Sequence, residues 1–585
     1  MNDPVNPQTS QPDPETLSQS QGETHEVFNQ PTALEQYNAY DTDGVLKYWL
    51  QQFNGDWADD LLRGYGHRVG HELLTAGFLA NKHKPEFNSH DRFGKRIDQV
   101  DFHPAYHQLM QTAIEGGHHS LPWVNPRPGA HVARAAMEYL HSQADPGTGC
   151  PLTMTFASVT AIAQQANIAE LWLPKITANE YDGRNIPFYE KQGLTIGMAM
   201  TEKQGGSDVR ANTTKAYPVA EGGPGAAYSI VGHKWFCSAP MCDAFLVLAY
   251  VQNPAKDTGD SHNTDQDSLS CFLLPRWRPT GQKNEMYIQR LKDKMGNVSN
   301  ASSEVEYRGA LAWMIGPQGR GVATIIEMVS MTRFDCMVGS SAAMRLATAQ
   351  AIHHTGGRHV FGKPLHEQPL MKNVLADLAI EAEAALAITM RIAHALDATP
   401  SQDNYQHELR FSRVATAVGK YWICKRTAVH HAEAMECIGG VGLIEDNVLA
   451  RLYREAPVNA IWEGSGNVQC LDVLRALQKD PRTTEAFFTE IDAARGQHPS
   501  LDGYIDQLKL AFADTDNMEY RARSLVEQMA KAWQASLLLT KGDPIVAEAF
   551  IRSRIENNAG LQLGTLPAGV DVKAIIERAT ARINE

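Results

Sequence analysis

Three short segments carry residue types that could hold a flat cofactor or move a proton. The first, residues 198–208 (MAMTEKQGGSD), leaves an apolar run and enters a turn with two glycines. Glycines let backbone N–H groups approach a ligand closely, and nearby hydroxyls add polar contacts. The segment predicts either a ligand-binding turn or an ordinary glycine-rich loop between strands.

The second segment, residues 232–238 (GHKWFCS), precedes a strongly apolar run at 245–251. Trp and Phe on a strand most often belong to the core. The functional alternative is an aromatic wall that packs against a flat heterocycle.

The third segment, residues 451–475, contains Glu463 between Trp462 and Gly464, ahead of a stretch with helical periodicity. An acidic residue at a helix start is commonly a cap or a dipole partner. The functional alternative is a carboxylate that is partly desolvated beside an aromatic wall. Such a group would be basic enough to take a proton from carbon.

The elements that position these segments change type along the chain. Residues 1–25 predict a disordered tail, 26–193 a helical domain, 194–310 a β domain, 311–480 a helical bundle and 481–585 a further helical domain. Strand-like runs occupy 194–200, 228–236, 245–251, 269–274, 286–291 and 303–307. Long amphipathic stretches cover 370–396 and 411–437, the second ending at Gly439 and Gly440. This order predicts an α+β fold with segregated domains.

Composition limits the function classes. The chain has 585 residues, a formal net charge of -14 and eight cysteines. We find no secretory or transit signal, no membrane-spanning run, no metal-ligand spacing and no GxGxxG or P-loop, so the cytoplasm is the expected compartment. His118 and His119 could be metal ligands, but partners of carboxylates are the favoured interpretation. DNA binding by so acidic a chain would need a local basic patch.

Taken together, the three segments resemble the acyl-CoA dehydrogenase family. The family motif TEPxxGSD corresponds to residues 201–208, its WIT triplet to 236–238 and its YEGT to 462–465. Its RxxFG falls on Arg358, Phe361 and Gly362. The resemblance implies an N-terminal helical domain, a central β-barrel-like domain and a C-terminal four-helix bundle, here with an additional helical domain.

The resemblance also implies an FAD site between the β domain and the bundle. Glu463 would take the α-proton of an acyl thioester, and its backbone N–H would help polarise the thioester carbonyl. Arg358 and Phe361 would reach the FAD of a neighbouring subunit, which implies a homo-oligomer, a tetramer. The residues expected to bind FAD are Met198, Met200, Thr201, Gly205, Gly206, Ser207, Phe236, Cys237, Ser238, Arg358, Phe361, Trp462, Ser465 and Asn467.

The chain departs from the family pattern at four points. Trp462 replaces the usual Tyr, and Ser330 replaces the acid three residues before Arg333. A family Gln falls on Pro369, with Gln368 one position early, and another Gln is Glu436. The family acid that Ser330 replaces helps to position substrate. FAD binding is therefore expected to survive these changes better than efficient dehydrogenation.

Within the family, the chain resembles the AidB branch, flavoproteins of the bacterial response to DNA alkylation. The segments that carry this resemblance include residues 27–31, 150–156, 290–302, 331–336 and 358–365. The resemblance implies an association with double-stranded DNA, and Arg475 matches an arginine that links flavin and DNA functions. Other basic candidates are Arg521, Arg523, Lys531, Arg552 and Arg554; the alternative for all of them is a solvated surface with charge pairs.

Two hypotheses remain. The favoured one is a DNA-binding flavoprotein of the alkylation response that retains weak dehydrogenase activity toward isovaleryl-type acyl-CoA. The alternative is a catabolic dehydrogenase for short- or branched-chain acyl-CoA.

Overall fold

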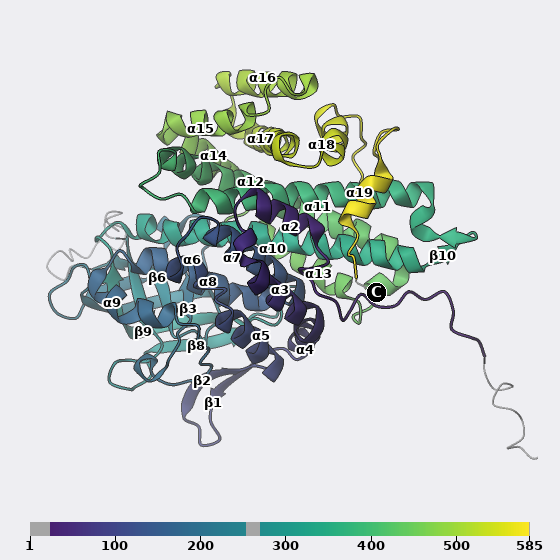
Figure 1. Cartoon of the computed structure of the whole chain (residues 1–585). Helices are drawn as coiled ribbons and strands as arrows, with labels where there is room; N and C mark the ends of the chain where they lie inside the picture. The colour runs from purple at the N-terminus through teal and green to yellow at the C-terminus, as the bar shows by residue number, and fades with distance from the viewer. Residues whose placement is uncertain (1–23, 253–268, 584–585) are drawn as a thin grey trace, which may run out of the picture.

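The computed structural model describes residues 24–252 and 269–583. The expected disordered tail lies almost wholly outside these residues. The strands that precede the long helices gather at one end of the molecule (Figure 1). Three long helices run lengthwise through its middle, and the C-terminal helices cover the bundle on another side.

The N-terminal part is mainly helical, as its periodicity predicts. Its helices are α2 (Gly44–Gln52), α3 (Asp59–Arg68), α4 (Leu74–Lys82), α5 (Pro104–Glu115), α6 (Leu121–Val124), α7 (Ala130–Ala144), α8 (Pro146–Ile162) and α9 (Ala166–Ile176). Asp145 separates α7 from α8 and caps α8, because its side chain accepts a hydrogen bond from the N–H of Thr148. The sequence did not predict the hairpin β1 (Glu86–His90) and β2 (Arg96–Asp101).

The central domain is a closed barrel with two extra strands. Its strands are β3 (Ile196–Ala199), β4 (Lys215–Pro218), β5 (Ala227–Ser238), β6 (Ala244–Val251), β7 (Leu269–Pro275), β8 (Met286–Leu291) and β9 (Ser302–Ile315). The pairings β4–β5, β5–β9, β9–β7, β7–β6 and β6–β4 close the ring, while β3 joins β6 and β8 joins β9. All six expected runs lie on strands. Strand β4 was missed because its four residues, KAYP, include a lysine and a proline and form no apolar run.

Helices α10 (Gly321–Gly357), α11 (Pro369–Leu396) and α12 (Tyr405–Ile438) pack against one another along the middle of the molecule (Figure 1). Helix α13 (Val448–Ile461) and α14 (Gly466–Lys479) pack on α12. Helix α12 ends where the sequence predicts, because Gly439 takes a φ of 76° that residues with a side chain rarely adopt.

The C-terminal helices are α15 (Pro481–Asp492), α16 (Pro499–Ala513), α17 (Met518–Lys541), α18 (Pro544–Phe550) and α19 (Val572–Ala579). They share a hydrophobic core with the bundle, since Trp533 of α17 packs edge-on against Phe411 of α12 and contacts Phe487 of α15. Within the described parts of the chain, no helix is both long and apolar enough to cross a membrane.

Candidate active site

Glu463 lies in a tight turn between α13 and α14. Its φ is 57°, and that of Gly464 is 104°. A left-handed backbone at a residue with a side chain costs on the order of 1–3 kcal/mol and persists only where surrounding contacts fix it. The turn therefore depends on its neighbours in the fold.

Lys420 of α12 supplies one set of these contacts. Its ammonium is buried and donates hydrogen bonds to the carbonyls of Asn459 (3.0 Å), Trp462 (2.7 Å) and Gly464 (2.8 Å). Two of these carbonyls belong to the last turn of α13 and its cap, where a cation is also favoured by the helix dipole. Lys420 thus ties the end of α13 to both sides of Glu463.

Arg333 of α10 and Gln469 of α14 supply the second set. Nε of Arg333 donates to the carbonyl of Glu463 (2.9 Å), and Nη1 pairs with Asp472 (2.8 Å). Nε2 of Gln469 donates to the same Glu463 carbonyl (3.1 Å). Arg333, which the family pattern retains, therefore holds the turn, and its counter-charge is Asp472 of α14.

The carboxylate of Glu463 is half-buried. Its Oε2 accepts a hydrogen bond from the hydroxyl of Thr332 (2.8 Å). Burial raises the pKa of Glu463, and the Thr332 hydrogen bond and the charges of Lys420 and Arg333 oppose that rise. A carboxylate with a raised pKa is a stronger base, so the group suits proton abstraction. Among the described residues, no acceptor binds the N–H of Glu463, which leaves it free for a substrate carbonyl.

The second half of the site is the loop after β3. Its turn is tight, because a Cβ on Gly206 would come within 2.3 Å of the Thr201 hydroxyl, and Gly205 has a φ of 135°. The Thr201 carbonyl accepts from the N–H of Trp235 on β5 (2.8 Å). Ser207 is exposed, and no protein acceptor binds its N–H or that of Gly206 within the described ranges.

Glu202 anchors this loop to the barrel through buried contacts. Its carboxylate is fully buried, pairs with Lys234 (2.8 Å) and accepts from the hydroxyl of Thr214 (2.6 Å). These partners hold the pKa of Glu202 at about 2, against the effect of its burial. Glu202 is thus a structural residue, a role that the motif alone did not reveal.

The three candidate residues of strand β5, at positions 236–238, point to alternate faces of the strand. Phe236 is 46% exposed and Ser238 is half-buried, whereas the Cys237 side chain is fully buried. Any contact of Cys237 with a cofactor would therefore come from its backbone. The ammonium of Lys292 lies 4.7 Å from the Phe236 ring centroid, on the outer side of the barrel.

Cys150 of α8 lies between the two halves of the site, the loop and strand of the β domain and the Glu463 turn. Burial raises the pKa of its thiol to about 12, the Glu463 charge adds to that rise, and a hydrogen bond with Ser238 opposes it. The thiol therefore lies near both the β5 residues and the Glu463 turn. Exposed aromatic and hydroxyl groups, free loop N–H donors and a nearby carboxylate fit an isoalloxazine ring bound between these halves. Met198 is buried on β3, and Met200 begins the loop that follows it. Trp462 and Ser465 lie in the Glu463 turn, and Asn467 lies in the first turn of α14.

Arg358 and Phe361 lie elsewhere. They belong to a hairpin formed by β10 (His359–Val360) and β11 (Lys363–Pro364), at the end of the molecule away from the barrel (Figure 1). Phe361 is 98% exposed, and Nη1 of Arg358 donates to the carbonyl of Asn29 (2.8 Å). The fold does not bring this pair to the Glu463 turn of the same chain.

The basic candidates differ in their surroundings. Arg475 is exposed on α14 and forms no ion pair with any described residue. Arg523 is exposed and donates to the Tyr421 hydroxyl (3.3 Å), and Arg521 binds backbone carbonyls, including that of Asp516 (3.1 Å). Arg554 follows the alternative of charge pairing, because its guanidinium is largely buried and pairs with Asp377 and Glu381 of α11.

Of the two adjacent histidines, His118 has the expected carboxylate partner and His119 has a backbone carbonyl instead. His118 is buried and bonds to the Glu138 carboxylate, and His119 bonds to the carbonyl of Ala178 (3.0 Å). Burial lowers the pKa of His119 to about 4. Nowhere in the described ranges do three potential His, Cys, Asp or Glu ligands converge on a metal position.

Comparison with known proteins agrees with this geometry. Residues 29–183 match the adaptive response protein AidB N-terminal domain, 197–310 the acyl-CoA dehydrogenase middle domain and 319–478 its C-terminal domain. The chain is therefore a member of the acyl-CoA dehydrogenase family and an FAD-dependent oxidoreductase. Within that family it belongs with AidB: it is 41% identical to AidB of Escherichia coli (strain K12) over 92% of this chain and 96% of the relative.

Two further relatives extend the comparison. Acyl-CoA dehydrogenase family member 11 of Caenorhabditis elegans is 29% identical over 88% of this chain and 81% of its own length. The crystal structure of Caenorhabditis elegans ACDH-11 in complex with C11-CoA matches with a TM-score of 0.80 at 24% identity, covering 97% of this chain and 95% of that one. At that identity the likeness shows the fold.

Sequence reasoning missed several residues that hold the site. Thr332 directly precedes Arg333, so the retained arginine could have pointed to it. Asp472 follows Glu463 by nine residues on the next helix. Lys420 carries no local signal, because only the packing of α12 against α13 brings it to the turn.

Proposed function

We propose that this chain is a cytoplasmic, homotetrameric flavoprotein of the DNA alkylation response. It would bind double-stranded DNA and retain weak acyl-CoA dehydrogenase activity of the isovaleryl type. The observation that carries the enzymatic part is the Glu463 turn. Its carboxylate has a raised pKa and is held by Thr332, while Arg333 and Lys420 hold the backbone of the turn.

In the proposed reaction, Glu463 takes the α-proton of the acyl thioester, and its free N–H donates to the thioester carbonyl. Bound FAD supplies the hydride acceptor. Met200, Thr201, Gly206, Ser207, Phe236 and Ser238 would hold the flavin ring, and Arg358 and Phe361 would reach the FAD of another subunit.

Weak activity is supported by two substitutions near the turn. Ser330 leaves α10 without the acid that helps to position substrate in the family. The Trp462 indole is held by a hydrogen bond from its Nε1 to Asn459 (2.8 Å), and an indole is larger than the usual phenol. Both changes would weaken substrate binding more than cofactor binding.

The DNA part rests on the likeness to AidB and on Arg475, an exposed cation without an ion pair among the described residues. Burial of Arg554 narrows the basic surface that could contact phosphates. A catabolic dehydrogenase is the second candidate, and the intact Glu463 turn favours it.

An anaerobic titration with a panel of acyl-CoAs, isovaleryl-CoA included, tests the enzymatic part through the visible flavin band. Slow bleaching that is lost in Glu463→Gln, by roughly 10²–10⁴-fold in rate, supports the proposal. Rapid and complete bleaching favours the catabolic candidate, and no bleaching by any acyl-CoA rules out both dehydrogenase assignments.

DNA binding is measured separately by titrating duplex DNA at several salt concentrations. Affinity that falls steeply with salt supports the proposal. Arg475→Ala should weaken it and reduce the slope of log affinity against log salt by about 1, whereas Arg482→Ala, at an exposed arginine paired with Asp480, is the matched control. Absence of binding at low salt would exclude the DNA function.

A further inference from the structure

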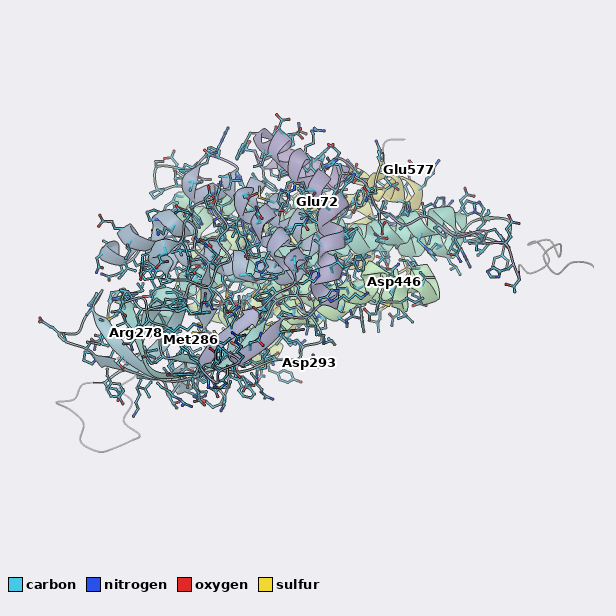
Figure 2. All side chains as sticks on the ribbon, turned by 90° about the horizontal axis from the view of Figure 1, so that it is seen from below. Glu72, Arg278, Met286, Asp293, Asp446 and Glu577 are labelled. Carbon is cyan, nitrogen blue, oxygen red and sulfur yellow. The ribbon has the colours of Figure 1, made fainter. Side chains whose placement is uncertain are left out.

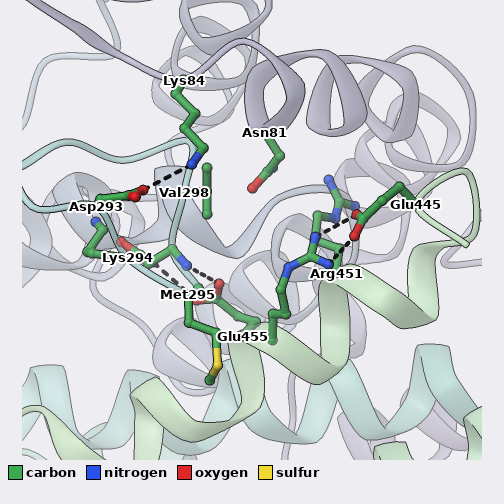
Figure 3. Close-up of a pocket in the computed structure, with 12 residues that line it drawn as sticks. Asn81, Lys84, Asp293, Lys294, Met295, Val298, Glu445, Arg451 and Glu455 are labelled. Carbon is green, nitrogen blue, oxygen red and sulfur yellow. Dashed lines mark hydrogen bonds and ion pairs between the residues drawn. The ribbon is translucent and has the colours of Figure 1, made fainter. Parts of the chain in front are cut away.

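A cavity of about 540 Å³ lies between α4, the connection from β8 to β9 and the first half of α13 (Figure 3). Its volume falls within the usual range of small-molecule sites, roughly 300–1,000 Å³. None of its residues belongs to the Glu463 turn or to the set expected to hold FAD. The lining residues are Asn81, Lys84, Asp293, Lys294, Met295, Gly296, Asn297, Val298, Glu445, Arg451, Arg454 and Glu455.

The charges at the rim neutralise each other. Lys84 pairs with Asp293 (3.0 Å), and Arg454 forms a two-point pair with Glu445 (2.5 and 2.8 Å). Asp293 lies on the face of the molecule seen in Figure 2. Because each cation is paired with one carboxylate, the entrance carries no strong net charge, and solvent screens these partly exposed pairs further.

Arg451, deeper in the cavity, is different. It is 6% exposed, and its only hydrogen bond among the described residues runs from Nη2 to the Ala144 carbonyl (2.9 Å). Nε and Nη1 are buried, and no atom of residues 24–252 or 269–583 accepts a hydrogen bond from them. A guanidinium has five N–H donors, and a buried cation without a hydrogen-bonded counter-charge is unfavourable.

The two carboxylates nearest to Arg451 are engaged elsewhere. Asp145 accepts hydrogen bonds from Ser299 (2.8 Å) and from the N–H of Thr148 (2.8 Å). Glu455 accepts from the backbone and side chain of Asn297. Neither forms an ion pair with Arg451, although both raise its pKa, which burial lowers.

Lys294 adds a second desolvated cation. Its ammonium donates to the Asn300 carbonyl (2.7 Å) and the Ser302 hydroxyl (2.8 Å), both neutral acceptors. Burial lowers its pKa to about 8. The interior of the cavity therefore holds two cationic groups whose counter-charge is not supplied by a direct ion pair.

We propose that this cavity binds a small organic oxyanion, a carboxylate or a phosphate ester, with Arg451 as the anchoring side chain. Both groups present the paired oxygen acceptors that a guanidinium binds best. The polar lining disfavours a long acyl chain. The proposal is independent of the reaction at Glu463, because it concerns binding at residues outside that site.

Calorimetric titration of the full-length flavoprotein with acetate and with inorganic phosphate, at constant ionic strength adjusted with chloride, tests the proposal. We expect saturable binding of at least one anion at millimolar concentration or below. The anion that binds more tightly, acetate or phosphate, identifies the ligand class. Arg451→Gln should weaken that binding by roughly tenfold or more, while the flavin spectrum stays unchanged.

Met295→Trp provides a second variant that keeps every charge and fills the cavity, since Met295 lines it and is exposed. It should abolish binding even if Arg451→Gln does not fold. Arg482→Gln, on α15, is the control that should bind normally. Absence of saturable binding by both anions, or unchanged binding in Met295→Trp, would overturn the proposal and leave a water-filled cavity.

Discussion

The Thr332 hydroxyl of α10 lies 2.8 Å from Oε2 of Glu463 in the turn between α13 and α14. A side chain 131 residues earlier in the chain thus fixes the carboxylate and stabilises its ionised form. Burial works in the opposite direction, and the balance between the two sets the basicity of Glu463.

Thr332→Val should move the acidic limb of the pH–rate profile to higher pH. The hydrogen bond lowers the pKa of Glu463, so its loss raises that pKa, and the base is then deprotonated only at higher pH. At a fixed acidic pH the rate of flavin reduction should fall by roughly fivefold. Thr332→Ser keeps the hydroxyl and should retain the original profile; an equal fall at every pH would point to lost packing instead.

Lys420→Met should loosen the turn that presents Glu463. It removes three hydrogen bonds from a buried ammonium and leaves their carbonyls without this donor, which should cost about 3 kcal/mol in the free energy of unfolding. Denaturant unfolding measures the free energy of unfolding. The rate of flavin reduction reports whether the turn still positions Glu463. The control is Lys425→Met on the exposed side of the same helix. If both variants behave alike, Lys420 does not fix the turn.

Glu202→Gln should remove a pH dependence of stability at the acidic end. The folded pKa of Glu202 is about 2, below its usual value of 4.5. The ionised form therefore stabilises the fold above pH 4.5, and this contribution, at most about 3 kcal/mol, is lost as the pH falls toward 2. Between pH 5 and pH 2, the free energy of unfolding should fall less steeply in the variant than in the parent protein. An unchanged slope would mean that other carboxylates dominate.

Phe361→Ala should weaken FAD retention in the assembled protein without unfolding the subunit. Phe361 is 98% exposed at the tip of the β10–β11 hairpin and buries no surface within its own chain. Its removal should therefore leave thermal unfolding of the apoprotein within about 0.5 kcal/mol of the parent. The FAD content after gel filtration and the apparent mass report on the neighbouring-subunit contact. Full FAD retention at unchanged mass would contradict that role.

Much of this protein follows from its sequence. Local periodicity located six of the seven strands of the central β domain and the long helices, because side-chain burial repeats with the period of each element. Motif residues with special backbone needs, such as Gly205, Gly206 and Glu463 with Gly464, marked both halves of the site. The hairpin β1–β2 and strand β4 escaped because short polar strands carry little periodic signal.

Tertiary structure alone decided which distant side chains meet. Helix packing brings Thr332 and Lys420 to the Glu463 turn and Asp472 to Arg333 beside it. Only Thr332 had a local signal, the retained Arg333 that follows it. The same packing places Arg554 against two carboxylates of α11, leaves Phe361 exposed, and gives Arg451 no ion pair with any described residue. A sequence determines which segments are helix, strand or turn through local preferences. The pairing of charges and donors depends on three-dimensional distances, which only the assembled fold defines.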